Sequence, residues 1–175
     1  MSSYSVGKQE ISDWVRKHFK NDATILDVGA CDGVWKRFLP EYKNMDALEV
    51  FGLNFAQLTD YREKYLADIR DFEYDWYDLI VFGDIIEHLP VKDAQSVLNY
   101  AWGRCLDLII AVPWLYPQGE LYGNPYEIHI QDDLTPEIFA QRYPDYELLL
   151  DTGYNYCYYH KKGGYYDKAR DRDSG

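Results

Sequence analysis

The sequence lacks the features that would place a chain in a membrane or send it out of the cell. The segment MSSYSVGKQE has no basic stretch followed by an apolar run, the pattern of a secretory signal. The longest apolar runs, over 79–82 and 108–115, are far shorter than the ~18 residues that a membrane span needs. We therefore expect a cytoplasmic protein without a membrane partner.

Cysteine is scarce as well. The three cysteines, Cys31, Cys105 and Cys157, lie far apart and form no CxxC motif. An odd number of thiols without a secretory signal is typical of reduced, intracellular cysteine and argues against a disulfide framework. A zinc site built on cysteine is disfavoured on the same ground.

Basic residues are the third shortage. The chain has 18 Lys and Arg against 30 Asp and Glu, and a formal net charge of −12. A protein that binds bare nucleic acid needs a dense basic surface to neutralise phosphates, so such a partner is disfavoured and a small molecule is favoured. The 175 residues, 47% of them hydrophobic, suffice for one folded domain.

Strand and helix patterns alternate along this domain, which predicts an α/β fold with a mostly parallel sheet. Apolar runs indicate strands at 24–28, 45–50, 65–67, 77–83 and 106–112. Helical spacing indicates helices at 6–19, 34–39, 54–62, 93–104 and 135–143. Two strands at 146–152 and 155–160 form an antiparallel pair that closes a domain over 1–160, and we expect 161–175 to be a disordered tail.

The turn after the first strand has the composition of a ligand site. Asp27–Gly33 reads DVGACDG, and Glu49 ends the next strand, where a carboxylate can accept both ribose hydroxyls of an adenosine. A dinucleotide site needs G-x-G-x-x-G so that a pyrophosphate can approach a helix N-terminus. Here Asp32 stands where the phosphate would lie, and Asp27 adds a second acid. The pattern favours a cationic ligand, S-adenosylmethionine, over NAD.

These residues resemble a known family. ILDVGACDG is similar to the first motif of the class I, seven-strand S-adenosylmethionine-dependent methyltransferases, of the type 11/12 kind, with Cys31 where glycine is more usual. YDLIVFGDIIEHL is similar to their fourth motif, and a strand that ends in Val112-Pro113 is similar to their fifth strand. The resemblance covers residues 6–160 and implies a Rossmann-like, doubly wound sheet of seven strands with an antiparallel last strand.

The resemblance also implies a set of cofactor-binding residues. Glu49 matches the ribose-binding acid, and Ala67-Asp68-Ile69 resembles the segment that flanks the adenine. The residues expected at S-adenosylmethionine are Asp27, Gly29, Ala30, Cys31, Gly33, Glu49, Asp68, Ile69, Gly83 and Asp84.

A second group of polar residues follows the fourth strand. Asp84, Glu87 and His88 are spaced i, i+3 and i+4, so they would share a face if the turn is helical. Together with His129 they resemble the divalent-metal site of ubiquinone-biosynthesis O-methyltransferases and small-RNA 2′-O-methyltransferases. The same E-H-L sequence occurs in metal-free members, where the acid caps a helix and the histidine packs, so whether the protein uses a divalent metal stays open.

His129 lies in a long aromatic loop over 113–133, near the expected ligand crevice. We expect it to be a general base or a substrate contact, with Asp84 and His88 as further catalytic candidates. The alternative for His129 is a loop histidine that bonds only to its neighbours. The loop, the N-terminal helix or a second copy of the chain in a homodimer would supply the acceptor pocket.

The expected function is transfer of a methyl group from S-adenosylmethionine to an oxygen or nitrogen atom of a small molecule. Two alternatives belong to other classes. One is a non-catalytic subunit that binds S-adenosylmethionine and serves a partner protein. The other is an NAD(P)-dependent oxidoreductase, which the glycine spacing and Asp32 disfavour.

Overall fold

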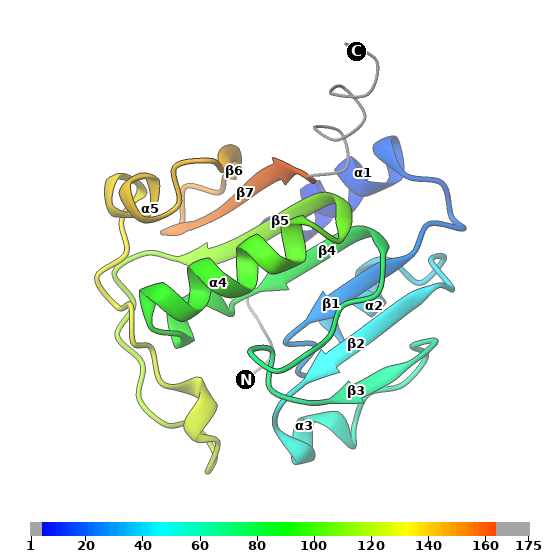
Figure 1. Ribbon diagram of the computed structural model, residues 1–175, viewed down its shortest axis with the longest axis horizontal. Helices are drawn as coiled ribbons and strands as arrows, with labels where there is room; N and C mark the ends of the chain where they lie inside the picture. The colour runs from blue at the N-terminus through cyan, green and yellow to red at the C-terminus, as the bar shows by residue number, and fades with distance from the viewer. Residues whose placement is uncertain (1–4, 164–175) are drawn as a thin grey trace.

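The computed structural model describes residues 5–163, which form one twisted sheet with helices on both faces (Figure 1). The strand order is β3-β2-β1-β4-β5-β7-β6. The strands are β1 Ile25–Val28, β2 Met45–Glu49, β3 Lys64–Leu66, β4 Tyr77–Gly83, β5 Cys105–Pro113, β6 Glu147–Asp151 and β7 Tyr156–Lys162. Strands β1 to β5 run parallel, and β7 is antiparallel to both of its neighbours.

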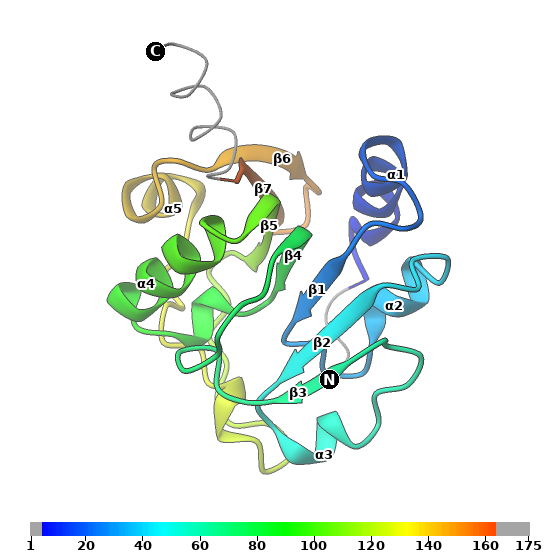
Figure 2. The same cartoon turned by 45° about the vertical axis from the view of Figure 1, so that its right-hand side comes forward.

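Alternate residues of each central strand face opposite layers of helices. In β4, Ile80 and Phe82 belong to the apolar cluster under α4 Val91–Trp102 and α5 Pro136–Arg142. Leu79 and Val81 belong to the cluster under α1 Lys8–His18 and α2 Val34–Phe38. Figure 2 shows the two pairs of helices on opposite sides of the sheet. Because both faces are covered, the central strands are apolar at nearly every position, as the sequence indicated.

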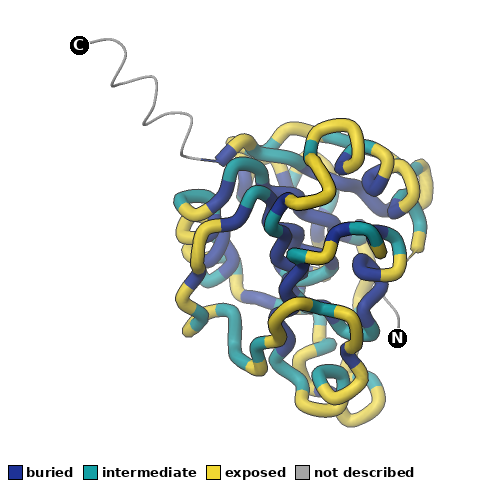
Figure 3. Tube along the Cα trace, turned by 90° about the vertical axis from the view of Figure 1, so that its right-hand side faces the viewer, coloured by how far each residue is buried: buried dark blue, intermediate teal, exposed yellow. Residues whose placement is uncertain are grey.

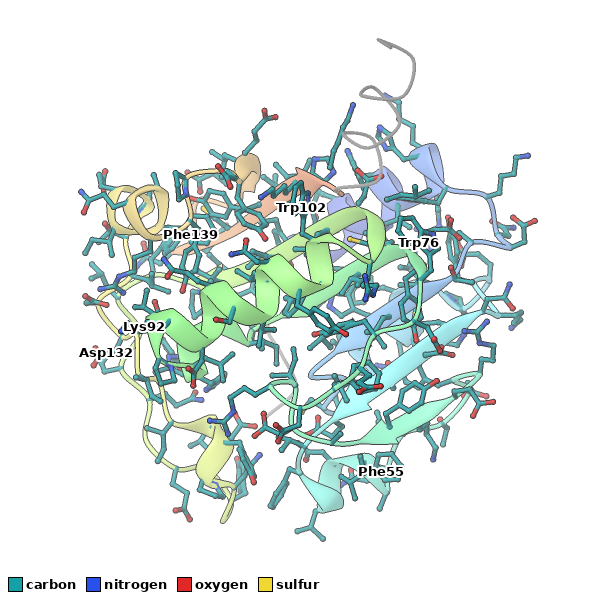
Figure 4. The ribbon with its side chains drawn as sticks, in the orientation of Figure 1. Phe55, Trp76, Lys92, Trp102, Asp132 and Phe139 are labelled. Carbon is teal, nitrogen blue, oxygen red and sulfur yellow. The ribbon has the colours of Figure 1, made fainter. Side chains whose placement is uncertain are left out.

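Burial follows these layers. The central strands are buried, whereas exposed residues occur in the connecting segments, the helices and the edge strands β3 and β6. Figure 3 shows buried segments inside the molecule and exposed segments toward its outside. On the α4 and α5 side, Phe139 stacks on Tyr159 with ring centroids 3.8 Å apart and joins α5 to β7 (Figure 4). None of the helices in residues 5–163 has the length and apolar character that a bilayer crossing requires.

The structure corrects the predicted helix over 54–62. Helix α3 covers only Gly52–Phe55, and the chain that follows is not helical and turns at Asp60, where φ is 66°. The turn directs the Tyr61 hydroxyl to Asp27, and the Arg62 N–H donates to the carbonyl of Met45 in β2. The polar, helix-compatible composition of this segment did not indicate the turn.

The last strand extends past residue 160, where the sequence predicted its end. Strand β7 runs to Lys162, and Lys161 and Lys162 pair with Leu108 and Asp107 of β5. The expected disorder of the tail concerns 164–175, which lie outside the described residues.

Candidate functional site

Two adjoining clefts open where the parallel strands end. The first has a volume of about 120 Å³ and lies between the β1 turn, the end of β4 and the 113–133 loop. The second, of about 330 Å³, lies between the β1 turn and the segments after β3 and β4. Figure 1 shows the loop, in yellow-green, at this edge of the sheet. The clefts share Gly29, Val50, Ile85, His88 and Tyr126, so they are two compartments of one crevice.

The strand order explains why the crevice lies here. After β3 the chain crosses to β4, on the opposite side of β1, so the connections after β1 and β4 leave in different directions. Ligands of open α/β sheets bind at such a switch point, outside the carboxyl ends of the strands.

The turn after β1 has the left-handed backbone that its glycines permit. Gly29, Cys31 and Gly33 have φ of 70°, 48° and 75°. A Cβ on Gly29 would lie 2.1 Å from Cδ1 of Ile85, the side chain that stands between the two compartments. The position therefore requires glycine both for its conformation and for the close approach of Ile85.

Glu49 is held rigidly at the wall of the first compartment. Its carboxylate accepts hydrogen bonds from the backbone N–H of Cys31, at 2.9 Å, and of Phe51, at 2.8 Å. The residue is 5% exposed, and burial raises the pKa of its carboxyl group. Each oxygen keeps an acceptor site beyond these bonds, so the carboxylate can also receive hydroxyl donors from a ligand.

Asp68 and Ile69 line the second compartment, whose other walls are mostly apolar. The Asp68 carboxylate accepts from the guanidinium of Arg70 at 2.5 Å, and this ion pair lowers the pKa of Asp68. Val50, Leu89 and Tyr126 supply apolar and aromatic surface of the kind that a flat heterocycle contacts.

Of the remaining predicted cofactor residues, Gly29, Cys31, Gly83 and Asp84 line the first compartment. Asp27, Ala30 and Gly33 line neither compartment. Asp27 is fully buried, accepts a hydrogen bond from the Tyr61 hydroxyl at 2.5 Å, and burial raises its pKa to about 7. Ala30 and Gly33 belong to the turn after β1 and do not line the crevice.

The expected single helical face for Asp84, Glu87 and His88 is wrong. Asp84 has φ 57°, and only a short 3₁₀ turn, Ile86–His88, follows it. Asp84 therefore lies outside the helical turn that holds the other two residues, and its carboxylate accepts from the Tyr156 hydroxyl at 2.6 Å. Non-glycine residues adopt this backbone conformation only where the surroundings hold them in it, which is common at functional sites.

Glu87, His88 and His129 do come together. One ligand atom from each can be chosen so that all three lie within 4.8 Å of one another, and the two imidazole rings have centroids 4.6 Å apart. Glu87 is buried, neither of its carboxylate oxygens has a hydrogen-bond partner among the described residues, and burial raises its pKa well above the usual value.

Both histidines are oriented by backbone carbonyls. The Nδ1 of His88 lies 3.2 Å from the carbonyl of Ile128, and that of His129 lies 2.6 Å from the carbonyl of Tyr116. Because a carbonyl only accepts, each Nδ1 carries the proton, and in the neutral ring each Nε2 is unprotonated. Burial lowers the pKa of both rings, which favours this neutral state. A neutral Nε2 can bind a metal ion or take a proton.

Several residues of the site had no signal in the sequence. Tyr156 of β7 reaches the first compartment, although the aromatic closing strands suggested structure alone. Gln131 links the end of the 113–133 loop to the segment after β4, because its amide donates to the carbonyls of Ile86 and Leu89. Both contacts join segments that are far apart in sequence, so only the tertiary structure shows them.

No protein-family model matches the sequence, and no curated protein matches it either. Solved structures do match. An S-adenosylmethionine-dependent methyltransferase from Clostridium acetobutylicum aligns with TM-score 0.65 and 14% identity over 92% of this chain and 93% of that one.

Two further solved methyltransferase structures also align with this chain. The N-terminal domain of EvdMO1, crystallised in the presence of S-adenosylhomocysteine and D-fucose, aligns with TM-score 0.64 and 16% identity over 93% of this chain and 84% of that one. Magnesium protoporphyrin IX methyltransferase from Synechocystis, with bound S-adenosylmethionine, aligns with TM-score 0.60 and 12% identity over 89% and 79%.

The chain has the class I methyltransferase fold. The expected seven-stranded, mostly parallel sheet is thereby confirmed. The fold also separates this chain from the nicotinamide-dinucleotide enzymes, whose classic strand order is 3-2-1-4-5-6. In the class I methyltransferase fold seen here, β7 is antiparallel and lies between β5 and β6.

Proposed function

We propose that the protein transfers a methyl group from S-adenosylmethionine to an oxygen or nitrogen atom of a small-molecule acceptor. The single observation that carries the proposal is Glu49, fixed by two backbone N–H groups at the junction of the glycine turn and the crevice. A carboxylate in that place can accept the two hydroxyls of a ribose.

The two compartments suit the two ends of this cofactor. The second compartment, with Val50, Ile69 and Leu89, would contain the adenine, and Glu49 would bind the ribose. The sulfonium would then lie in the first compartment. No lysine or arginine lines that compartment in residues 5–163, whereas several acids do, and this charge balance favours a cation: Glu49, Asp84, Glu87 and Glu127.

The acceptor would bind between the sulfonium and the 113–133 loop. The loop presents rings at Tyr116 and Tyr126, and amide groups at Gln118 and Asn124, to the first compartment. Rings and amides of this kind bind a small polar or cyclic molecule. Among residues 5–163, no lysine or arginine lines the compartment to neutralise phosphates, which supports a small molecule over bare nucleic acid as the acceptor.

The reaction would be an in-line displacement, in which the sulfonium–methyl bond breaks as the bond from the acceptor atom to the methyl carbon forms. The protein would align the two reactants, and Nε2 of His129 would receive the proton of a hydroxyl acceptor. His88 lies against His129 and would position it.

A divalent cation also fits beside these residues. The oxygens of Glu87, which are without partners among the described residues, and the unprotonated Nε2 atoms of His88 and His129 are an appropriate donor set for it. Such an ion would lower the pKa of an acceptor hydroxyl. A chelator should then abolish turnover and a divalent ion should restore it; full activity in EDTA would leave His129 as the base without a metal.

His129→Ala should lower turnover much more than the affinity for S-adenosylhomocysteine, since the ring acts on the acceptor. A His129→Gln variant preserves volume and polarity and serves as the matched control. Equal loss of turnover and affinity in both variants would indicate a structural role for His129.

Calorimetric titration with S-adenosylhomocysteine and with NAD tests the cofactor, and transfer of a labelled methyl group to a panel of hydroxyl and amine acceptors tests the reaction. We expect binding of S-adenosylhomocysteine, no binding of NAD, and labelled product. Binding without transfer to any acceptor would favour the non-catalytic subunit.

We also propose a cytoplasmic location. Sedimentation with and without ligand would test the predicted homodimer.

A further inference from the structure

Helix α1 contains a buried lysine that the proposed reaction leaves unexplained. Lys8 is 0% exposed, and its Nζ has no hydrogen-bond or ion-pair partner among residues 5–163. The ammonium lies 4.5 Å from the centroid of the Trp35 ring and 6.0 Å from that of Tyr156. An ammonium buried without hydrogen-bond acceptors is strongly unfavourable, so a further partner is expected at this position.

The chain before α1 holds Lys8 in place. Gly7 has φ 75°, and a Cβ there would lie 2.6 Å from the Tyr158 ring. The Tyr158 hydroxyl donates to the carbonyl of Val6 at 2.7 Å. These contacts press the first turn of α1 against the sheet, so the inward direction of Lys8 is built into the fold.

Three other polar atoms near Lys8 are buried without a hydrogen-bond partner in the described part of the chain. They are Nε1 of Trp35, one oxygen of Asp27 and one oxygen of Asp84. The pKa of Lys8 is lowered by burial and raised by the charges of Asp84 and Asp27, which places the three side chains in one electrostatic group. The group contains two donors, Lys8 and Trp35, and two acceptors, the aspartates. That set complements an ammonium and a carboxylate on the same ligand.

The group borders the first compartment. Asp84 and Tyr156 line the compartment and are joined by a hydrogen bond. Trp35 packs closely against Gly83, because a Cβ on that glycine would be 2.8 Å from the indole Nε1. Lys8 lies over the same indole ring, and its Nζ is 6.0 Å from the ring of Tyr156. The lysine is thus next to two side chains, Trp35 and Tyr156, that border the place proposed for the sulfonium.

We infer that Lys8 binds the carboxylate at the amino-acid end of the cofactor, with Trp35 as a second donor and Asp84 as acceptor for the ammonium. The inference rests on the proposed function. The inference also gives the negative carboxylate of the ligand a positive partner. No lysine or arginine of residues 5–163 lines the first compartment, and Arg70 of the second compartment forms an ion pair with Asp68. Without Lys8, the ligand carboxylate would lie beside several acids with no lysine or arginine of residues 5–163 to balance them.

The experiment compares three ligands on wild type and on Lys8→Met by calorimetry: S-adenosylhomocysteine, its decarboxylated analogue and methylthioadenosine. Methionine keeps the length and apolar stem of lysine. In wild type, loss of the carboxylate should weaken binding roughly 10- to 100-fold, the range of a hydrogen bond to a charged group. In Lys8→Met, S-adenosylhomocysteine should weaken by a similar factor, whereas the decarboxylated analogue and methylthioadenosine should bind as in wild type.

Lys36→Met is the matched control. Lys36 is also buried, at 6% exposure, but its Nζ donates to the carbonyl of Tyr42 at 2.6 Å and lies outside both compartments. This variant should preserve the preference of wild type for the carboxylate-bearing ligand.

The outcomes separate the inference from the proposed function. If wild type binds neither S-adenosylhomocysteine nor methylthioadenosine, the proposed function fails and the assignment of Lys8 fails with it. If wild type binds both and Lys8→Met weakens all three ligands equally, Lys8 is structural and the inference alone is overturned. If Lys8→Met does not fold, the wild-type comparison still decides, because equal affinity for the ligands with and without the carboxylate excludes a carboxylate anchor.

Discussion

Replacing Asp27 by asparagine should make the protein more stable at neutral pH. Asp27 is fully buried, and burial raises its pKa from 3.8 to about 7. The folded protein therefore keeps the Asp27 proton up to about pH 7, whereas the unfolded chain releases it near pH 4. Between these values the folded state binds more protons, so this residue lowers the free energy of unfolding as the pH rises.

The magnitude follows from the two pKa values. They differ by about three pH units, and at 1.36 kcal/mol for each, the full effect is about 4 kcal/mol. The isoelectric point is near 4.6, so measurements are best made from pH 5 to pH 8. About 3 kcal/mol of the effect lies in that window. Asparagine has no proton to release, and its side-chain oxygen can still accept the hydrogen bond from Tyr61.

Urea unfolding followed by circular dichroism measures the difference. We expect wild type and Asp27→Asn to be nearest in stability at pH 5, and the stability difference to change by about 3 kcal/mol in favour of the variant between pH 5 and pH 8. Tyr61→Phe is the control, because the Tyr61 hydroxyl lowers the pKa of Asp27 and its removal should move the wild-type decline to higher pH. A difference between wild type and Asp27→Asn that does not change with pH would refute the reasoning.

Two further changes test the turn and the carboxylate. Gly29→Ala places a Cβ 2.1 Å from Ile85 at φ 70° and should lower the free energy of unfolding by roughly 1–3 kcal/mol, measured by urea unfolding. Gly119→Ala, which meets nothing within 4 Å, should be nearly neutral, and equal stability of the two variants would contradict the close-approach argument. Glu49→Gln should weaken binding of S-adenosylhomocysteine roughly 10-fold or more in calorimetry; unchanged affinity would remove Glu49 as the ribose contact.

Local sequence patterns predicted most of the sheet. The strand over 77–83 was predicted with the bounds that β4 has, because a strand buried on both faces is apolar throughout and ends at Gly83. The helix after Thr135-Pro136 was also predicted, since its capping signals are local, and the Thr135 hydroxyl accepts from the N–H of Ile138 as expected. Helix α3 was predicted too long, and the segment after it bonds to distant residues instead, through Tyr61 to Asp27 and through Arg62 to Met45.

The candidate site, like the fold, was predicted only in part from the sequence. The sequence by itself determined the glycine turn and Glu49, because a strand–turn–helix unit places both at the carboxyl ends of neighbouring strands. Only the tertiary structure decided the rest. Lys8 and Tyr156 come from opposite ends of the chain and meet at Asp84 and Trp35, and His129 meets Glu87 and His88 across the loop. Such contacts depend on how helices and loops pack on the sheet, and periodicity and turn chemistry do not encode that packing.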